Sequence, residues 1–195
     1  MVAGYGVNDK SLIWPQLVAD DLELELINHG IPGGSNKAIW RSVMETEFNS
    51  DDLVIIQWTY STRFCFFTNP NVTVDLRGGM LEQKTVAVDR NFLEVFYGDM
   101  FTFYDAATDL LGRANHIHHH LNAHGVSYMM NQVWPTPEFH QVSKAAWNQV
   151  EICHLFDIPE LKKKYSLAED NEHPGYQANK IMSECYLTEI KQKLF

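Results

Sequence analysis

Two residues near the end of the chain have the types and spacing of an acid–base pair. Asp170 and His173 lie three positions apart, directly before Pro174 and Gly175 and a segment with helical periodicity. A carboxylate at this spacing can accept the imidazole N–H, fix the tautomer of the ring and stabilise the imidazolium that forms on proton uptake. The pair is therefore a candidate general base. The alternative is that Asp170 only caps the final helix and His173 is a surface residue.

A second candidate feature is a glycine-rich turn before a helical segment. Gly33 and Gly34 precede Ser35 and Asn36. Because glycine allows a backbone N–H to approach a ligand closely, this turn could donate to an oxyanion; a plain turn is the alternative. Asn36 is a further candidate for substrate binding. Ser35 could be proposed as a nucleophile, but we expect Ser35 or Asn36 to be the N-cap of the helix.

Polar residues also follow an apolar run at 52–58. Thr59, Ser61 and Arg63 come directly after it. Any of the three could donate to an oxyanion, and the Arg63 guanidinium could hold a carboxylate or phosphate of a substrate. The alternative is that the hydroxyls only satisfy the backbone of a loop.

Five histidines raise the question of a metal site: His116, His118, His119, His120 and His124. His116, His120 and His124 would share one helical face, as zinc-binding pairs do. A His-Glu-x-x-His motif is missing, and histidines also suit the carboxyl end of a helix. We expect neither a metal nor another cofactor. The three cysteines have no Cys-x-x-Cys spacing and predict free thiols.

The expected elements place these residues at one edge of a sheet. Residues 22–28 alternate apolar and acidic side chains, which predicts an outer strand, and 37–44 have helical spacing. Residues 52–58 are continuously apolar, as in a central parallel strand. Together they predict a right-handed βαβ unit. A long loop is expected over 59–79, at the carboxyl end where such sheets bind ligands.

The second half of the chain predicts more helix than strand. Residues 84–122 predict two helices or one broken helix, with Gly98 and Gly112 as interruptions, and 126–131 predict a strand. A closing amphipathic helix is expected within 174–195. Several aromatic residues could line a site for acyl or sugar groups, although core packing is the more common role of such residues. They are Phe64, Phe66, Phe67, Trp134 and Phe139.

Composition bounds the class of protein. The 195 residues are 45% hydrophobic and carry a formal net charge of −10, which predicts one globular domain spanning residues 1–195. An acidic chain is a poor partner for nucleic acids and for anionic membranes. No apolar stretch is long enough to span a membrane, and no signal peptide follows Met1, so we expect a cytoplasmic protein.

The order of the motifs resembles a known family. The segments that carry the resemblance are Gly4–Asp9 with Trp14–Leu17, Asn28 with Gly33–Asn36, Asp52–Ile56 with Trp58, Thr59 and Arg63, and Asp170–Pro174. Their order is similar to that in SGNH (GDSL-type) hydrolases of phages and marine bacteria. For a phage-encoded member, the cytoplasm would be that of the host.

The resemblance implies an α/β fold with three layers, α/β/α, around a flavodoxin-like parallel sheet. It also implies a serine esterase or acetylhydrolase that cleaves acyl esters of small molecules or glycans. Asp170 and His173 would be the acid and the base of the triad, and Gly33 and Gly34 would supply an oxyanion donor.

Two departures from the family pattern bear on activity. The family's nucleophile lies in a Gly-Asp-Ser-type block at the end of the first strand, just before a segment like 2–7. This chain begins at Met1, where that block should have just ended. We therefore expect the first strand and the serine to be missing, as if translation had begun at an internal methionine. The chain should then be inactive and prone to self-association.

The second departure lies after the central strand, where the family places a Gly-x-Asn-Asp whose Asn donates to the oxyanion. This chain has Gln57-Trp58-Thr59-Tyr60-Ser61 there instead. An alternative function is accordingly a non-catalytic ligand-binding or virion-associated module on the same fold.

Overall fold

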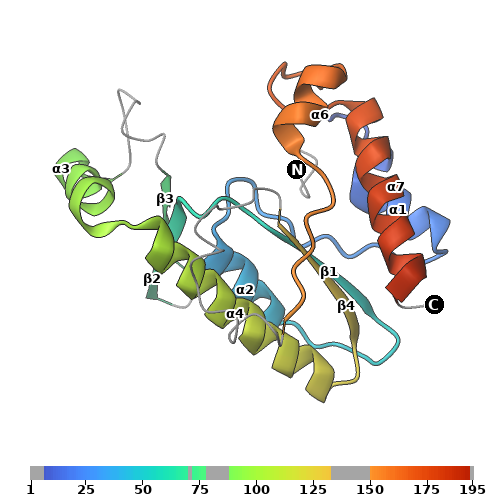
Figure 1. Ribbon diagram of the computed structural model, residues 1–195, viewed down its shortest axis with the longest axis horizontal. Coiled ribbons are helices and arrows are strands. Elements are labelled where there is room, and N and C mark those ends of the chain that lie inside the picture. Colours follow the sequence, from blue (N-terminus) through green and yellow to red (C-terminus); the bar gives the residue numbers. More distant parts are fainter. Residues whose placement is uncertain (1–6, 70–71, 78–87, 133–149, 194–195) are drawn as a thin grey trace.

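The computed structural model describes residues 7–69, 72–77, 88–132 and 150–193. Its arrangement is mixed helix and strand (Figure 1). The strands are β1 (Leu53–Trp58), β2 (Arg63–Asn69), β3 (Val72–Arg77) and β4 (Ser127–Gln132). The helices are η1 (Lys10–Leu12), α1 (Trp14–Asp21), α2 (Asn36–Met44), α3 (Arg90–Val95), η3 (Phe96–Met100), α4 (Phe103–Ala123), α6 (Ile158–Lys164) and α7 (Tyr176–Lys193).

The centre of the molecule is a parallel strand pair. β1 and β4 pair from Leu53 opposite Ser127 to Trp58 opposite Gln132. Cys153 extends this pair by a parallel bridge to Asn131 on the far edge of β4. The expected strands at 52–58 and 126–131 are thus confirmed. The chain is of the α/β type in this coarse sense, with a small parallel sheet.

Helices cover both faces of the β1–β4 pair (Figure 1). Leu53 and Ile55 face a cluster built on α1 and α7, which includes Trp14, Met182 and Tyr186. The alternate side chains of β1, Ile56 and Trp58 among them, face a cluster built on α2 and α4. The apolar run of β1 is explained by this packing, because a strand covered on both faces needs apolar side chains on both.

The expected outer strand at 22–28 is wrong. α1 continues to Asp21, and its end is closed by the N–H of Leu24 donating to the Ala19 carbonyl, with Glu23 at φ 57°. The following residues 24–31 have no regular structure. Leu24 and Ile27 are 44% and 73% exposed. The alternating pattern needs a neighbouring strand, and no described strand lies beside this segment.

The expected long loop at 59–79 is also wrong in part. β2 and β3 form an antiparallel hairpin in which Arg63 lies opposite Arg77. Phe64 packs edge-on against Phe96 and Phe101, whereas Phe66 packs against Phe92 and Phe96. These two phenylalanines therefore join the hairpin to α3 and η3. They line a cavity of about 360 Å³ that Arg63 also lines, but not the cavity of about 1340 Å³ beside β1. Trp134 and Phe139 lie outside the described residues.

The remaining helical predictions are largely confirmed. The 84–122 region contains more than one helix, as expected, but the break falls at residues 101–102, between η3 and α4. Gly98 lies inside η3, and Gly112 lies inside α4 without interrupting it. The closing helix is α7. Among the described residues, no helix is both long and apolar enough to cross a membrane.

Candidate active site

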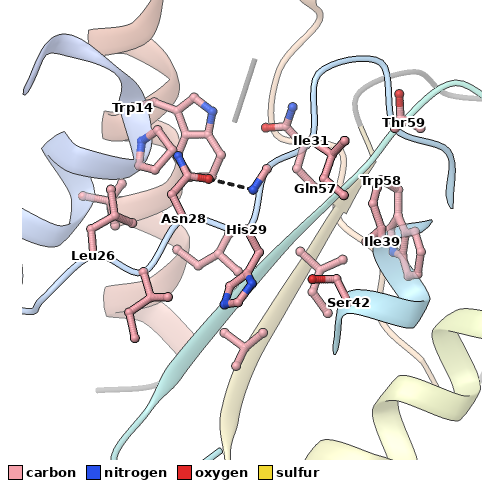
Figure 2. Close-up of a pocket in the computed structure, with 18 of the residues that line it drawn as sticks. Trp14, Leu26, Asn28, His29, Ile31, Ile39, Ser42, Gln57, Trp58 and Thr59 are labelled. Carbon is pink, nitrogen blue, oxygen red and sulfur yellow. Dashed lines mark hydrogen bonds between the residues drawn. The ribbon is translucent and has the colours of Figure 1, made fainter. Parts of the chain in front are cut away.

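A cavity of about 1340 Å³ runs along the edge of β1 that does not pair with β4. Figure 2 shows Trp14 of α1 and Leu26 on one side of β1, and Ile39 and Ser42 of α2 on the other. The segment that includes Asn28 also lines the cavity. Thr59 and the loop that carries His173 also line it. The cavity thus reaches the carboxyl end of β1, where parallel sheets position ligands.

Asp170 and His173 form a hydrogen-bonded pair. The Nδ1 atom of His173 lies 2.6 Å from Oδ2 of Asp170. The other carboxylate oxygen, Oδ1, accepts the backbone N–H groups of Glu172 and His173, each at 3.0 Å. Both side chains are about 30% exposed. This geometry fixes the imidazole with Nδ1 toward the carboxylate, so Nε2 is the atom that would take up a proton.

The backbone hydrogen bonds keep Asp170 ionised. The N–H groups of Glu172 and His173, followed by the His173 side chain, lower the pKa of Asp170 from 3.8 to about 2. Each of these donors favours the charged carboxylate. Asp170 is therefore an anion throughout the neutral range, as the partner of a general base must be.

A short hairpin-like loop holds the pair in place. The N–H of Ala168 donates to the His173 carbonyl at 2.8 Å, and Leu167 forms an antiparallel bridge with Pro174. The N–H of Gly175 donates to the Ser166 carbonyl at 3.1 Å. A Cβ at Gly175 would lie 2.6 Å from that same oxygen. The two sides of the loop can approach this closely only because residue 175 is glycine.

Asn179 joins this loop to α1. Its side-chain amide donates to the carbonyls of Pro174 and Gly175 at 3.0 and 3.1 Å, and its Oδ1 accepts the N–H of Trp14 at 3.0 Å. The residue is 3% exposed. Since three buried backbone groups depend on one side chain, Asn179 sets the position of the His173 loop.

The glycine-rich turn is held by Ser35 and Asn36. The Ser35 hydroxyl accepts the N–H of Ala38 at 3.2 Å, which confirms Ser35 as the N-cap of α2. The Asn36 side chain accepts the Thr59 N–H at 2.8 Å and donates to the Thr59 carbonyl at 3.3 Å. Asn36 therefore joins the start of α2 to the end of β1. Its amide positions Thr59 and is not directed at a substrate.

Two arginines lie at the same end of the cavity. Arg63 donates through Nη1 to the Thr59 hydroxyl at 2.9 Å. The Arg77 guanidinium covers Gly33, where a Cβ would collide with it. Gly33 has φ 73°, a left-handed conformation that favours glycine. Gly34 lines the main cavity as well, whereas Ser61 lines a smaller cavity of about 360 Å³ with Asn36 and Arg63.

A buried polar network fixes the carboxyl ends of β1 and β4. The Tyr186 hydroxyl donates to Gln57 Oε1 at 3.2 Å and accepts from the Asn131 amide at 3.0 Å. Asn131 Oδ1 in turn accepts the N–H of Leu155 at 3.1 Å. Burial raises the pKa of Tyr186, so the hydroxyl stays protonated and can donate. Gln57, which lines the cavity, is held by this network.

Histidines at the carboxyl end of α4 form hydrogen bonds with neighbouring groups. His116 accepts the indole N–H of Trp40 at 3.2 Å, His118 contacts the Tyr128 hydroxyl, and His124 bonds to the His120 carbonyl. Among the described residues, metal-ligand atoms gather only at Glu151, Cys153 and Glu189. There the Lys193 ammonium already contacts both carboxylates.

Sequence reasoning found some members of the site and missed others. The cavity brings together five predicted residues: Gly33, Gly34, Thr59, Arg63 and His173. Asp170 does not line the cavity itself, but it is hydrogen-bonded to His173, which does. Arg77 and Asn179 were not predicted. A signal for Asn179 exists in hindsight, because it is a polar residue on the apolar face of the closing helix.

Comparisons of this chain with protein-family models, with curated proteins and with solved structures find no match.

Proposed function

We propose that residues 1–195 form the acid–base and substrate-binding part of an SGNH-type serine esterase that hydrolyses acyl esters, including O-acetyl groups of glycans. The observation that carries the proposal is the hydrogen-bonded pair of Asp170 and His173 at the edge of the large cavity. An ionised carboxylate, an imidazole that it orients and a cavity for an acyl group are what acyl transfer requires.

In the proposed reaction, His173 accepts the hydroxyl proton of a serine as the serine oxygen attacks the acyl carbon. The protonated imidazole, stabilised by Asp170, gives that proton to the leaving alcohol as the acyl-enzyme forms. Water then attacks the acyl carbon, with His173 again acting as base, and releases the carboxylic acid and the serine.

The arrangement around β1 supports the proposal. The cavity, β1, β4 and the Cys153 bridge follow one another across the molecule. A flavodoxin-like sheet has the order 2-1-3-4-5. With β1, β4 and the Cys153 segment taken as strands 3, 4 and 5, the cavity occupies the place of strand 1. The nucleophile would lie at the carboxyl end of that strand, next to His173.

Two tryptophans contribute to the walls of this cavity. Trp14 and Trp58 both line it and are almost fully buried. We propose that a strand that carries the serine fills the cavity beside β1, and that this strand comes from polypeptide outside residues 1–195.

A hydrolysis assay tests the proposal. An extended polypeptide, translated from the next in-frame start upstream of Met1, should hydrolyse p-nitrophenyl acetate, whereas residues 1–195 alone should not. His173→Ala in the extended form should lower kcat by about a thousandfold or more, because the general base is lost. His119→Ala, an exposed histidine on α4, is the matched control. A folded extended protein that shows no hydrolysis contradicts the proposal.

One observation favours the alternative of a non-catalytic ligand-binding or virion-associated module. The Asn36 side-chain amide is hydrogen-bonded to the Thr59 backbone, so it is not directed into the cavity as an oxyanion donor. An extended protein that contains the serine but never reacts with a fluorophosphonate would support this second function.

A further inference from the structure

Two like charges face each other in the β2–β3 hairpin. Arg63 and Arg77 occupy directly opposite positions in the antiparallel register. Side chains at such positions have Cβ atoms roughly 5 Å apart, and like charges there are destabilising. Both arginines line the large cavity, at the end where Thr59 and Gly33 lie. The pair therefore concentrates positive charge at one place in the candidate site.

Arg63 is held in position by its surroundings. Its Nη1 donates to the Thr59 hydroxyl at 2.9 Å, and its guanidinium lies 5.0 Å from the centre of the Tyr60 ring. Burial, with a smaller contribution from the nearby Arg77 charge, lowers the pKa of Arg63. The Arg63 cation is thus already partly removed from water before any ligand arrives.

The acidic groups of the cavity do not neutralise these arginines. Within the described part of the chain, neither guanidinium forms an ion pair. Glu47, Asp51 and Asp52 line the cavity, but they precede β1 and so lie toward its amino end. Glu25 also lines the cavity, from the segment that follows α1, and is in no ion pair with either arginine. Glu172 belongs to the His173 loop. Two guanidiniums that have no carboxylate partner among the described side chains are an arrangement that an anion would complete.

We propose that Arg63 and Arg77 bind an anionic group of the ligand, a carboxylate or a phosphate, at the carboxyl end of β1. Planar guanidinium groups suit both anions, because each offers parallel N–H donors to two oxygens. Gly33 allows the Arg77 guanidinium to lie against the backbone of the turn. If the ligand is the ester substrate, which rests on the proposed function, the esterase prefers substrates with an acidic group near the scissile ester.

Anion binding can be measured without any enzymatic activity. Inorganic phosphate and succinate, titrated at constant ionic strength, should raise the melting temperature of residues 1–195, because a ligand that binds only the folded state stabilises it. Chloride at the same ionic strength controls for screening. Arg77→Gln should weaken the apparent Kd for phosphate by about ten- to a hundredfold, the loss expected for a charged hydrogen-bonding group.

The same variant separates ligand binding from a structural role. Without added anion, Arg77→Gln should melt no lower than the wild type, since it removes a like-charge contact. Arg63→Lys, which keeps the charge but loses the planar fork, should bind phosphate with intermediate affinity. Arg90→Gln, at an exposed ion pair with Glu94, is the control and should leave phosphate binding unchanged.

Two results would overturn the inference: equal stabilisation by phosphate in wild type and Arg77→Gln, or a lower melting temperature of Arg77→Gln in the absence of anion. The outcome is separate from that of the esterase proposal. Phosphate binding that is lost in Arg77→Gln, together with an extended protein that hydrolyses no ester, would keep the anion site and reject the hydrolase. Ester hydrolysis by the extended protein, without phosphate binding, would keep the hydrolase and reject the anion site.

Discussion

At the scale of single residues, Asp170 has the most completely defined role. Its Oδ1 accepts two backbone N–H groups, and its Oδ2 is hydrogen-bonded to the His173 ring. The capping alternative raised from the sequence and the acid–base interpretation are therefore not exclusive. The carboxylate shapes the turn and orients the imidazole with the same side chain. Such a dual role makes the ionisation of Asp170 important for stability as well as for chemistry.

This dual role predicts a pH dependence. The pKa of Asp170 is lowered from 3.8 to about 2 in the folded protein, so the unfolded chain binds the proton more readily. The contribution of Asp170 to stability is therefore present above about pH 4 and is lost as the pH falls toward 2. Melting curves of wild type and Asp170→Asn should differ at pH 5 and converge near pH 2.

Asp51→Asn, an exposed change of the same net charge, is the control for this experiment. A wild-type advantage over Asp170→Asn that stays constant down to pH 2 would contradict the role assigned to the carboxylate. In the extended protein, Asp170→Asn should also lower kcat by at least about a hundredfold, because the histidine tautomer is no longer fixed.

At the scale of elements, two glycines have opposite expected behaviour. A Cβ at Gly175 would lie 2.6 Å from the Ser166 carbonyl oxygen, whereas nothing lies within 4 Å of one at Gly112 in α4. Gly175→Ala should lower the free energy of unfolding by about 1–3 kcal/mol through overpacking. Gly112→Ala should raise it by about 0.5–1 kcal/mol, because alanine favours the helix.

Urea denaturation of the two variants checks this prediction, and each serves as the control for the other. If Gly175→Ala were as stable as the wild type, the close approach of the two sides of the His173 loop would be wrong. In the extended protein, Gly175→Ala should also lower esterase activity, since the loop sets the position of His173.

The elements that were predicted correctly are those whose apolar spacing or capping residue is visible in their own sequence. β1 is apolar on both faces because α1 and α7 cover one and α2 and α4 the other. The N-cap at Ser35 follows from a local hydrogen bond to Ala38. Such features need only nearby residues, so periodicity and capping rules suffice to find them.

The elements that were missed depend on distant partners. The alternation over 24–28 has the period of a strand, but a strand forms only where a neighbouring backbone pairs with it. The sequence between β2 and β3 contains a turn signal, Asn69-Pro70-Asn71. The pairing of these strands is nevertheless not local, because their phenylalanines pack against α3 and η3. For the same reason, the approach of Arg77 to Gly33 could not be expected from the sequence. The Asp170–His173 pair could be predicted from the sequence, because its two residues are only three positions apart.

At the scale of the whole molecule, the large cavity is the dominant feature. β1 is flanked by β4 on one edge and by about 1340 Å³ of cavity on the other. Leu53, Val54 and Ile55 are consequently only half-buried, although they belong to the central strand. An open strand edge with apolar surroundings is a site for pairing with another polypeptide.

This feature predicts that residues 1–195 alone associate with themselves. Sedimentation velocity should show assemblies that grow with concentration, and the extended polypeptide should sediment as a smaller, defined species with a higher melting temperature. A stable monomer of residues 1–195 at high concentration would show that the cavity needs no strand. The extended protein at matched concentration is the control.

The central claim is that this cavity receives the strand whose serine works with His173. It is tested most directly by treating the extended polypeptide with a fluorophosphonate and locating the adduct by mass spectrometry. We predict a single adduct, on a serine upstream of Met1, that forms much more slowly in His173→Ala. An adduct on a serine within residues 1–195, or none on the folded extended protein, would contradict the claim.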